Sequence, residues 1–257
     1  MPRSPDELRS LVEDCLEGQE LWPQLHGQAE SVRYSITVGG KRVRLVICLA
    51  TAEAAGAAPE AALPAGCALE LVHTFSLVHD DLPPLDADEE RRGQPSTWKR
   101  YGEAVGILAG DALLAEAFRL ATSYDTPRVA RELAGATLGM IGGQYLDITD
   151  TAPDEATLHT LKTGALFSAA VGLALWVAGV PEAGQAAWRA FGDELGLLFQ
   201  IVDDILDADG YVVTHGGDGA RRLADEAAER ARARLSAVDA DTSVLREIVD
   251  GLAVRTS

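Results

Sequence analysis

Apolar side chains recur along most of the chain at intervals of three and four residues, which places them on one face of an α-helix. Ala, Leu, Glu and Arg, which all favour helices, dominate the sequence. No segment shows a convincing alternation of apolar and polar positions, so the pattern predicts no β-strand. It predicts helices over residues 5–17, 27–37, 41–56, 60–81, 103–122, 127–148, 154–178, 182–208, 218–236 and 242–254.

No linker rich in Ser, Gly or Pro divides the chain, so we expect residues 1–257 to form one all-α domain. Several predicted helices exceed 20 residues, which favours a helical bundle with a central cavity between its helices. The uncharged run Ala165–Val180 has 16 residues, fewer than the roughly 20 that a membrane span needs. It therefore predicts a buried helix, and the sequence predicts no membrane span.

The chain is strongly acidic, with 22 Lys and Arg against 40 Asp and Glu and a net charge of −18. This balance argues against nucleic acid or an anionic membrane as a steady partner. An anionic substrate would need clustered cations or a bound metal. The three cysteines, Cys15, Cys48 and Cys67, are odd in number and lack metal-ligand spacing, so they predict buried thiols and a cytoplasmic protein.

Three aspartates follow an apolar helical run within seven residues: Asp80, Asp81 and Asp86. Carboxylates this dense repel each other, and a hard cation such as Mg²⁺, which often shares its ligands with substrate phosphates, relieves the repulsion. Arg91 and Arg92 come next and offer planar forks for phosphate oxygens. A solvated acidic turn before a basic segment is the alternative. These residues alone leave both interpretations open.

A second acidic cluster, Asp203, Asp204 and Asp207, lies within an otherwise apolar helix. Asp203 and Asp207 are four residues apart and point the same way, which destabilises a helix unless a cation compensates. The apolar neighbours make a solvated edge an unsatisfactory explanation. If the two acidic helices face each other, six carboxylates could hold metal ions over an apolar cavity. Such a site suits a substrate with a diphosphate head and a hydrocarbon tail.

Basic residues that could bind a second anion precede the first cluster. Gly39 and Gly40 come before Lys41 and Arg44, which lie one turn apart on one helix face and could form a diphosphate cradle. The alternative is a glycine break followed by ordinary surface charges. His73 lies two helical turns before the first aspartate, on the same face. A histidine on an apolar helix is more often a core residue than a ligand, so this position also stays open.

These segments together resemble the trans-isoprenyl diphosphate synthases. HDDLPPLDADEERRG (79–93) is similar to the first aspartate-rich motif of that family, and FQIVDDILD (199–207) is similar to the second. The remaining motifs of the family follow in the expected order, from about residue 27 to 210: GGKRVR, His73, ILAGDALL, GGQYLD and Lys162-Thr163. The resemblance implies an isoprenoid synthase fold and a homodimer. It also implies a short-chain, Mg²⁺-dependent prenyltransferase that condenses isopentenyl diphosphate with an allylic diphosphate through a carbocation.

The resemblance also implies residue roles. The principal Mg²⁺ ligands would be Asp80, Asp86 and Asp203, supported by Asp81, Asp204 and Asp207. The allylic diphosphate would be held by three Mg²⁺ ions, Arg91 and Lys162, and isopentenyl diphosphate by Lys41, Arg44, His73 and Arg92. Thr163 and Gln200 would line the reaction centre. The residues that act directly in catalysis would be Asp80, Asp81, Asp86, Arg91, Lys162 and Asp203.

Product length would depend on Phe75 and Ser76, five and four positions before the first aspartate. A ring there would form the floor of the tail cavity, which implies farnesyl (C15) or geranylgeranyl (C20) diphosphate as the product.

The segment after Asp209 departs from the family, because it lacks the G-K-x-x-G-x-D loop and no lysine follows Lys162. Either Arg221 or Arg222 substitutes in a shortened lid, or closure and activity are weakened. The missing loop leaves open a non-catalytic partner subunit of another prenyl synthase. A class I terpene cyclase, which also ionises diphosphates with Mg²⁺, is the other alternative, but GGKRVR and Arg92 argue against it, because a cyclase has no second diphosphate to hold.

Overall fold

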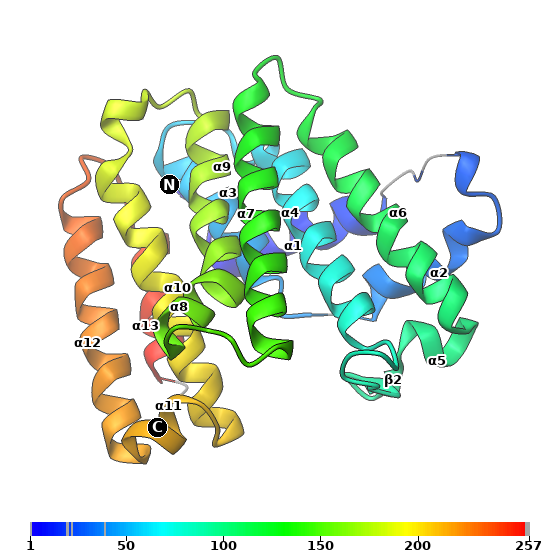
Figure 1. The fold of residues 1–257 in the computed structure, drawn as a ribbon. Coiled ribbons are helices and arrows are strands. Elements are labelled where there is room, and N and C mark those ends of the chain that lie inside the picture. Colours follow the sequence, from blue (N-terminus) through cyan, green and yellow to red (C-terminus); the bar gives the residue numbers. More distant parts are fainter. Residues whose placement is uncertain (1, 19–20, 22, 39, 255–257) are drawn as a thin grey trace.

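The computed structural model describes residues 2–18, 21, 23–38 and 40–254 and confirms the predicted all-α class (Figure 1). The α-helices of this part of the chain are α1 (Pro5–Glu17), α2 (Gln28–Thr37), α3 (Val43–Ala54), α4 (Pro59–Asp80), α5 (Thr97–Tyr101), α6 (Glu103–Ala121), α7 (Pro127–Ile148), α8 (Glu155–His159), α9 (Ala165–Val177), α10 (Ala186–Asp207), α11 (Tyr211–His215), α12 (Gly217–Ser236) and α13 (Ser243–Ala253). Short 3₁₀ helices lie at Pro23–Leu25 and Glu182–Gly184, and a π-helical turn lies at Thr160–Gly164.

Local signals in the sequence explain where several helices begin. Ser4 caps α1, because its hydroxyl accepts from the backbone of Glu7 while the Glu7 carboxylate accepts from the backbone of Ser4. Thr126 caps α7 by accepting from the backbone N–H of Arg128, and proline stands at the start of both helices. The predicted bounds of these two helices agree with the structure.

A small β-hairpin follows the first aspartate segment, and the prediction of no strand was wrong here. Strand β1 (Glu90–Arg91) pairs antiparallel with β2 (Gln94–Pro95). Arg92 and Gly93 connect them with φ angles of 55° and 74°. Two left-handed residues in a two-residue loop suit a type I′ turn, whose twist matches that of the strands. Strands of two residues are too short to show an alternating pattern in the sequence.

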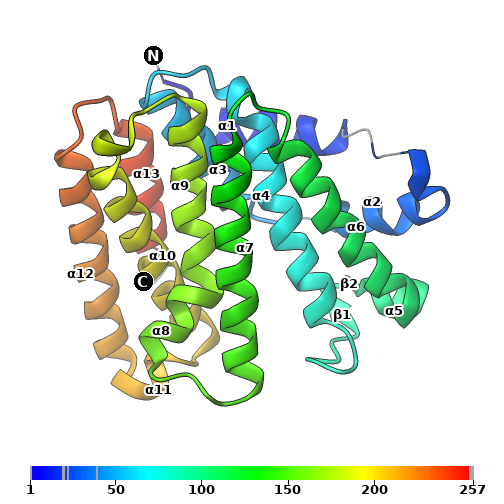
Figure 2. The same cartoon turned by 45° about the horizontal axis from the view of Figure 1, so that its top comes forward.

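The helices pack in two layers. In Figure 1, α12, α10, α9, α7, α4 and α6 lie side by side, and α13, α3 and α1 lie behind them, as the turned view in Figure 2 also shows. Helix α9 contacts α3, α4, α7 and α10 and is buried on nearly all sides. Buried apolar side chains from α1 through α13 form one continuous core. This packing fixes the ends of α4, α9 and α10, where the candidate site residues lie.

Two helical segments are long and apolar enough to satisfy the length and hydropathy of a membrane span. They are α4 and the continuous helix Glu155–Val177, which the sequence also predicted as one helix over residues 154–178. In the protein, 67% of the apolar window of α4 and 50% of the other window are buried. The higher share is typical of a core helix in a globular protein. In the second segment the buried residues lie in α9, in agreement with the buried helix predicted from Ala165–Val180.

Candidate active site

The first aspartate segment folds around the end of α4. The backbone N–H of Asp86 donates to the carbonyl of Asp80 at 2.9 Å, which closes the loop after the helix. The carboxylate of Asp81 is 3% exposed and accepts from Nε of Arg91 at 3.0 Å and also from its Nη2. Burial raises the pKa of Asp80 to about 6 and also raises that of Asp81. The hairpin therefore places Arg91 beside the first aspartate segment, whose negative charge is not fully balanced by neighbouring cations.

The metal-free protein is expected to lose stability as the pH rises from about 4 to about 6, apart from its other titrations. The folded pKa of Asp80, about 6, exceeds the unfolded value of about 3.9. The contribution of Asp80 to the free energy of unfolding is thus complete below the unfolded pKa and is lost as pH rises through the folded pKa. Urea unfolding in EDTA across this range measures the slope, which should be flatter in Asp80→Asn. Equal slopes in the two proteins would show that the pKa of Asp80 is not raised in the folded protein.

The second aspartate segment lies near the end of α10, and its members face different surroundings. Asp203 is partly buried beside cations, and burial raises its pKa while Lys41 opposes the change. Asp204 is 7% exposed, and its carboxylate accepts from Nε2 of Gln200 at 2.7 Å and from the backbone N–H of Tyr211 at 2.9 Å. Asp207 is exposed. Asp203 therefore lines the site, whereas Asp204 braces the turn after α10.

Asp204 also belongs to a small group with Glu155 and His159 of α8, whose possible ligand atoms lie within 4.8 Å of one another. The His159 ring stacks on Tyr211, with ring centroids 5.2 Å apart. These contacts connect α8, α10 and α11. The roles of Asp204 as a supporting metal ligand and of Gln200 at the reaction centre stay predictions.

A cationic cavity of about 360 Å³ lies between the start of α3, the hairpin and α10. The side chains that line it include all four predicted isopentenyl diphosphate ligands and two further site residues: Lys41, Arg44, His73, Arg92, Arg91 and Asp203. Gly40 lies close beside it, since an added Cβ would be 2.7 Å from Nη1 of Arg92 and would displace the end of that side chain. The other glycine of this pair, Gly39, lies outside the described residues. The residues predicted to form a diphosphate cradle thus come from separate segments and line one cavity. Lys41 precedes α3, so the prediction that it shares a helix face with Arg44 was wrong.

Arg44 is the best-held cation of this cavity. Its guanidinium stacks over Phe167 and Phe199, 4.5 Å and 5.5 Å from the ring centroids, and Nη1 donates to Nε2 of His73 at 3.4 Å. Burial lowers the pKa of Arg44 to about 10, so it stays charged at neutral pH. Its Nε is buried and has no hydrogen-bond partner among the described residues. An orphan donor on a fixed cation is suited to an anionic ligand.

His73 is neutral at neutral pH, because burial and the charges of nearby arginines lower its pKa well below the usual value. It can therefore donate or accept a hydrogen bond without adding charge.

Sequence reasoning missed Arg42, which has a φ of 49° and donates to Glu70 at 2.7 Å and to the carbonyl of Ile36 at 2.6 Å. Arg42 holds the segment on which Lys41 and Arg44 stand. Its position between these two basic residues gave no signal of this structural role.

An apolar cavity of about 430 Å³ adjoins the cationic one, since both are lined by Arg44, His73 and Leu77. Asp80 and Lys162 also line it, together with side chains of α4, α7, the π-helical turn and α9: Phe75, Ser76, Met140, Ile141, Gln144, Tyr145, Ile148, Thr163 and Leu166. Phe75 is 7% exposed, and its ring contacts His79 edge to face with centroids 5.0 Å apart.

Ser76 donates its hydroxyl proton to the carbonyl of His73 at 2.9 Å. Both predicted length-determining residues, Phe75 and Ser76, therefore line this cavity.

Lys162 stands on the π-helical turn at Thr160–Gly164 and donates to the carboxylate of Asp147 on α7. The two segments approach closely at Gly143, where an added Cβ would lie 2.5 Å from the backbone nitrogen of Lys162. Lys162 also lowers the pKa of Asp80 against the effect of burial, so its ammonium lies near the first aspartate segment. Single π-turns frequently occur at functional positions.

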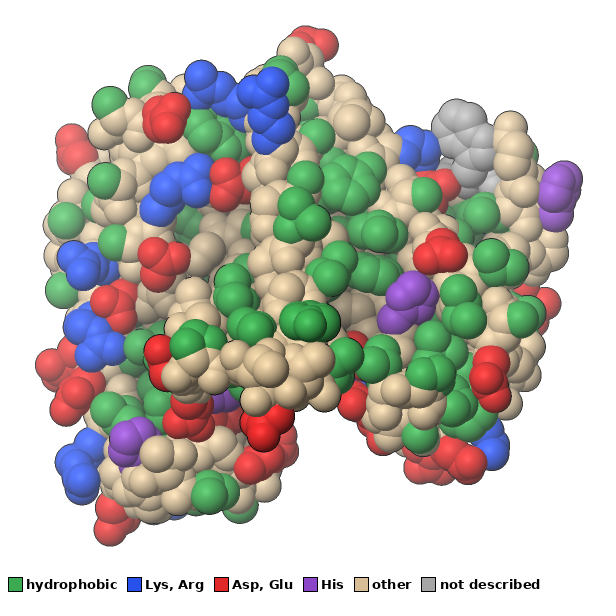
Figure 3. Space-filling model, in the orientation of Figure 1, with side chains coloured by type: hydrophobic (Ala, Val, Ile, Leu, Met, Phe, Trp, Pro, Cys, Tyr) green, Lys and Arg blue, Asp and Glu red, His purple; other side chains and the backbone are tan. Residues whose placement is uncertain are grey.

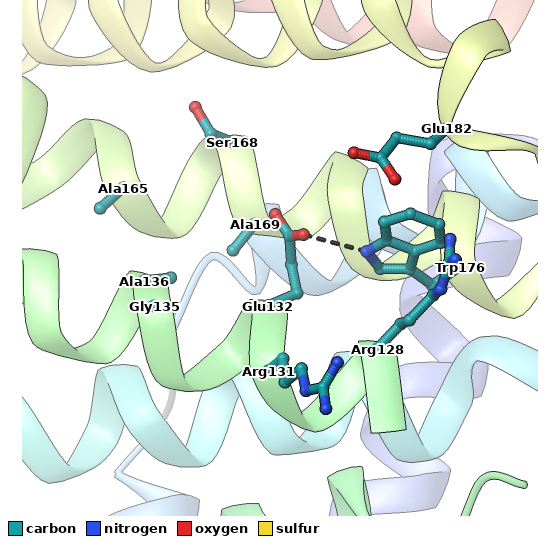
Figure 4. A pocket seen from close by; sticks show the side chains of 10 residues that line it. All are labelled: Arg128, Arg131, Glu132, Gly135, Ala136, Ala165, Ser168, Ala169, Trp176 and Glu182. Atoms are coloured by element: carbon teal, nitrogen blue, oxygen red, sulfur yellow. Dashed lines mark hydrogen bonds between the residues drawn. The ribbon is translucent and has the colours of Figure 1, made fainter. Parts of the chain in front are cut away.

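A larger cavity of about 540 Å³ lies between α7 and α9, away from both acidic segments (Figure 4). Its central carboxylate, Glu132, accepts from Nε1 of Trp176 at 3.0 Å and from Arg189 at 2.8 Å. Arg128 stacks over the Trp176 ring at 4.5 Å. These groups satisfy one another and connect α7, α9 and α10. The two smaller cavities, which are lined by the predicted site residues, are therefore the better candidates for the active site.

The atypical segment after Asp209 folds as α11 followed by α12. Arg221 and Arg222 are exposed on α12, and Arg221 lies 3.7 Å from Asp218. Neither arginine lines the cationic or the apolar cavity formed by the described residues. In this conformation, the two arginines do not replace the missing lysines.

The model of the polyprenyl synthetase family matches residues 27–219. A geranylgeranyl diphosphate synthase of Cyanophora paradoxa is 44% identical over 194 residues, which cover 69% of this chain and 64% of that protein. A farnesyl diphosphate synthase of Bacillus subtilis is 40% identical over 196 residues, covering 70% and 66% respectively. The chain thus spans slightly less than two thirds of the length of these curated relatives.

Solved structures agree over nearly the whole chain. A geranyltransferase from Legionella pneumophila superposes with a TM-score of 0.89 at 28% identity, covering 98% of this chain and 96% of the other. An FPP/GFPP synthase from Zymomonas mobilis gives a TM-score of 0.84 at 31% identity, covering 96% and 99%. The family that the aspartate motifs predicted is confirmed: the chain belongs to the polyprenyl synthetase family.

Proposed function

We propose that this protein is a Mg²⁺-dependent trans-prenyltransferase that joins isopentenyl diphosphate head to tail with an allylic diphosphate. The observation that carries the proposal is the meeting of a cationic cavity and an apolar cavity at Arg44 and His73. A substrate with a diphosphate head and a hydrocarbon tail matches this pair of environments. The relatives named for geranylgeranyl and farnesyl diphosphate synthesis support the same activity.

The carboxylates of the two aspartate segments fit a hard divalent cation. Burial raises the pKa of Asp80 although Lys162 opposes it, and raises that of Asp203 although Lys41 opposes it. The cations of the chain therefore leave negative charge uncompensated, which bound metal would neutralise. We propose three Mg²⁺ ions held by Asp80, Asp86 and Asp203, with Asp81, Asp204 and Asp207 in support. Bound Mg²⁺ would supply charge neutralisation for the departing diphosphate.

The side chains of the protein divide the remaining work. Arg91 and Lys162 orient the allylic diphosphate beside the first aspartate segment. Isopentenyl diphosphate is held in the cationic cavity by Lys41, Arg44, His73 and Arg92. The oxygens of Thr163 and Gln200 stabilise the allylic cation, which the double bond of isopentenyl diphosphate attacks. The new bond leaves a second carbocation, which loses a proton to the released diphosphate. The apolar cavity encloses the tail and excludes water that would quench the cation.

Incubation of the purified protein with Mg²⁺, isopentenyl diphosphate and allylic primers of increasing length tests the proposal. Mass spectrometry should show elongated diphosphates, with C15 or C20 as the end product, and EDTA should abolish them. A hydrocarbon formed from an allylic diphosphate alone would instead identify a terpene cyclase. Elongation only after a second synthase is added would identify a partner subunit. Absence of elongation with every primer rejects the proposal.

We also propose that the protein is a homodimer. Six large apolar side chains on α6 and α7 are 44–70% exposed: Ile107, Leu108, Leu138, Ile141, Tyr145 and Ile148. Those on α7 recur at intervals of three and four residues and form one stripe along that helix. Figure 3 shows hydrophobic side chains gathered over this region, between α7 and α6. An exposed apolar surface of this kind is typical of an interface.

Leu138→Glu is expected to shift the protein from dimer to monomer, because it places a charge in the stripe at its most exposed member, Leu138, which is 70% exposed. Sedimentation equilibrium measures the mass directly. Val213→Glu is the matched control, since Val213 is 74% exposed and lies outside the stripe on α11. A wild-type monomer, or an unchanged dimer in Leu138→Glu, argues against this interface.

Two further expectations stay proposals. We propose that residues 1–257 form one isoprenoid synthase-like domain, which the continuous core from α1 to α13 supports. A cytoplasmic location is proposed from the small number of cysteines and their free thiols.

A further inference from the structure

Two cysteines that are remote in sequence meet where α1 packs against α4. The sulfur atoms of Cys15 and Cys67 are 2.8 Å apart, although 52 positions separate them in the chain. This distance exceeds the roughly 2.05 Å of a disulfide bond by only about 0.8 Å. The third cysteine, Cys48, is buried in α3. The thiols of Cys15 and Cys67 therefore already stand side by side in the folded, reduced chain.

The helices that carry this pair are held in place by other contacts. Val12 and Leu16, which flank the first cysteine on α1, are 0% and 3% exposed in the core. One turn further along α4, Glu70 accepts from Arg42 at 2.7 Å, and Arg42 also donates to Glu13 of α1 at 3.3 Å. Contacts other than those of the two cysteines therefore hold α1 and α4 in the positions that bring the sulfur atoms together. A bond between them requires little movement of the backbone.

The two thiols differ in access and acidity, as an attacking and a resolving thiol do. Cys15 is partly exposed, whereas Cys67 is fully buried. The hydrogen bond from Cys67 lowers the pKa of Cys15, and the same contact together with burial raises the pKa of Cys67. An oxidant in solution therefore meets Cys15 first.

We propose that Cys15 and Cys67 are a redox-active pair that forms a disulfide between α1 and α4 under oxidising conditions. With a small-molecule disulfide such as oxidised glutathione, the thiolate of Cys15 attacks one sulfur and releases the first glutathione thiol. Cys67 then loses its proton, attacks the sulfur of Cys15 and releases the second glutathione. The two cysteines are oxidised by two electrons in total, and one oxidised glutathione is reduced to two thiols.

The bond would close a loop that contains α2, all of α3 and the first part of α4. Lys41 and Arg44 of the cationic cavity lie inside this loop. Because a cross-link removes conformational freedom from the unfolded chain, oxidation should stabilise the protein without adding a contact in the site. The segment that carries the anion-binding cations would then be fastened to α4, which carries the first aspartate segment.

The first experiment looks for the bond itself. The Cys48→Ala variant removes the third thiol, since trypsin otherwise leaves Cys48 and Cys67 in one peptide, residues 45–91. The folded variant is equilibrated with reduced and oxidised glutathione at a series of ratios, alkylated and digested. Peptide 10–33, which carries Cys15, should become linked to peptide 45–91. Two free thiols throughout the series, or glutathione retained on Cys15 in place of the link, overturns the proposal.

The second experiment measures what the bond does. Oxidised wild-type protein should melt about 5 to 10 °C above the reduced protein. Cys15→Ser should show no redox-dependent shift, and Cys48→Ala should keep it. Urea-unfolded protein treated with the same oxidant shows that the reagents are competent. A linked protein whose melting temperature is unchanged or lower contradicts the stabilising role.

Discussion

Asp80→Asn and Asp203→Asn are each expected to lower kcat by at least about 100-fold, because each removes a carboxylate charge that would hold Mg²⁺ at the departing diphosphate. Both side chains are partly buried, and burial raises both pKa values. Neutral amides at these positions should therefore leave the fold intact or slightly more stable. Steady-state kinetics over a range of Mg²⁺ concentrations, with circular dichroism as a check on folding, measures both effects.

Asp239→Asn provides the matched control, since Asp239 is exposed in the turn between α12 and α13. Its kinetics should equal those of the wild type. A folded Asp80→Asn or Asp203→Asn variant with near-normal turnover would show that the carboxylate is not a principal metal ligand. A large loss in the Asp239 variant would show that the assay reports net charge and not the site.

Phe75→Ala is expected to lengthen the main product by at least one isoprene unit. The ring is 7% exposed and lines the apolar cavity, so its removal opens space beneath the growing tail. The loss of packing against His79 should also lower the melting temperature, because truncation of a buried Phe costs about 3–5 kcal/mol when the site cannot collapse. Mass spectrometry of the products at a fixed primer and isopentenyl diphosphate ratio measures the chain length.

Phe118→Ala separates the two effects of this substitution. Phe118 packs against the same core but does not line the apolar cavity. Its truncation should lower stability and leave the product length unchanged. If Phe75→Ala folds and gives the wild-type distribution of products, Phe75 is not the floor of the cavity. A longer product from Phe118→Ala would mean that general loosening of the core sets the length.

Much of the helical architecture was predictable because its signals are local. Ser4, Glu7 and Pro5 at the start of α1 define its beginning within four residues. The apolar spacing that follows depends only on the period of the helix. The hairpin at Glu90–Pro95 was missed for the opposite reason. Its strands are shorter than the pattern that identifies a strand, and only the left-handed turn at Arg92 and Gly93 indicates it.

The candidate site was predictable in its residue types but not in its contacts. The structure brings Lys41, Arg92 and Asp203 to one cavity as expected. The orientation of Asp204 was out of reach, because it depends on a backbone donor at Tyr211, beyond the turn at Gly210. The Cys15–Cys67 contact likewise depends on how α1 docks on α4. Such contacts follow from tertiary packing, on which a single sequence carries little information.

The π-helical turn at Thr160–Gly164 fixes the rotational phase of the long helix that runs from Glu155 to Val177. An α-helix turns by about 100° per residue, and a π-turn accommodates one additional residue without ending the helix. Deletion of one residue here would leave a continuous helix with its apolar half still buried. Lys162 and the residues before it would then point in a different direction. When related sequences are compared, the number of residues in this segment therefore says as much about the site as the presence of the lysine.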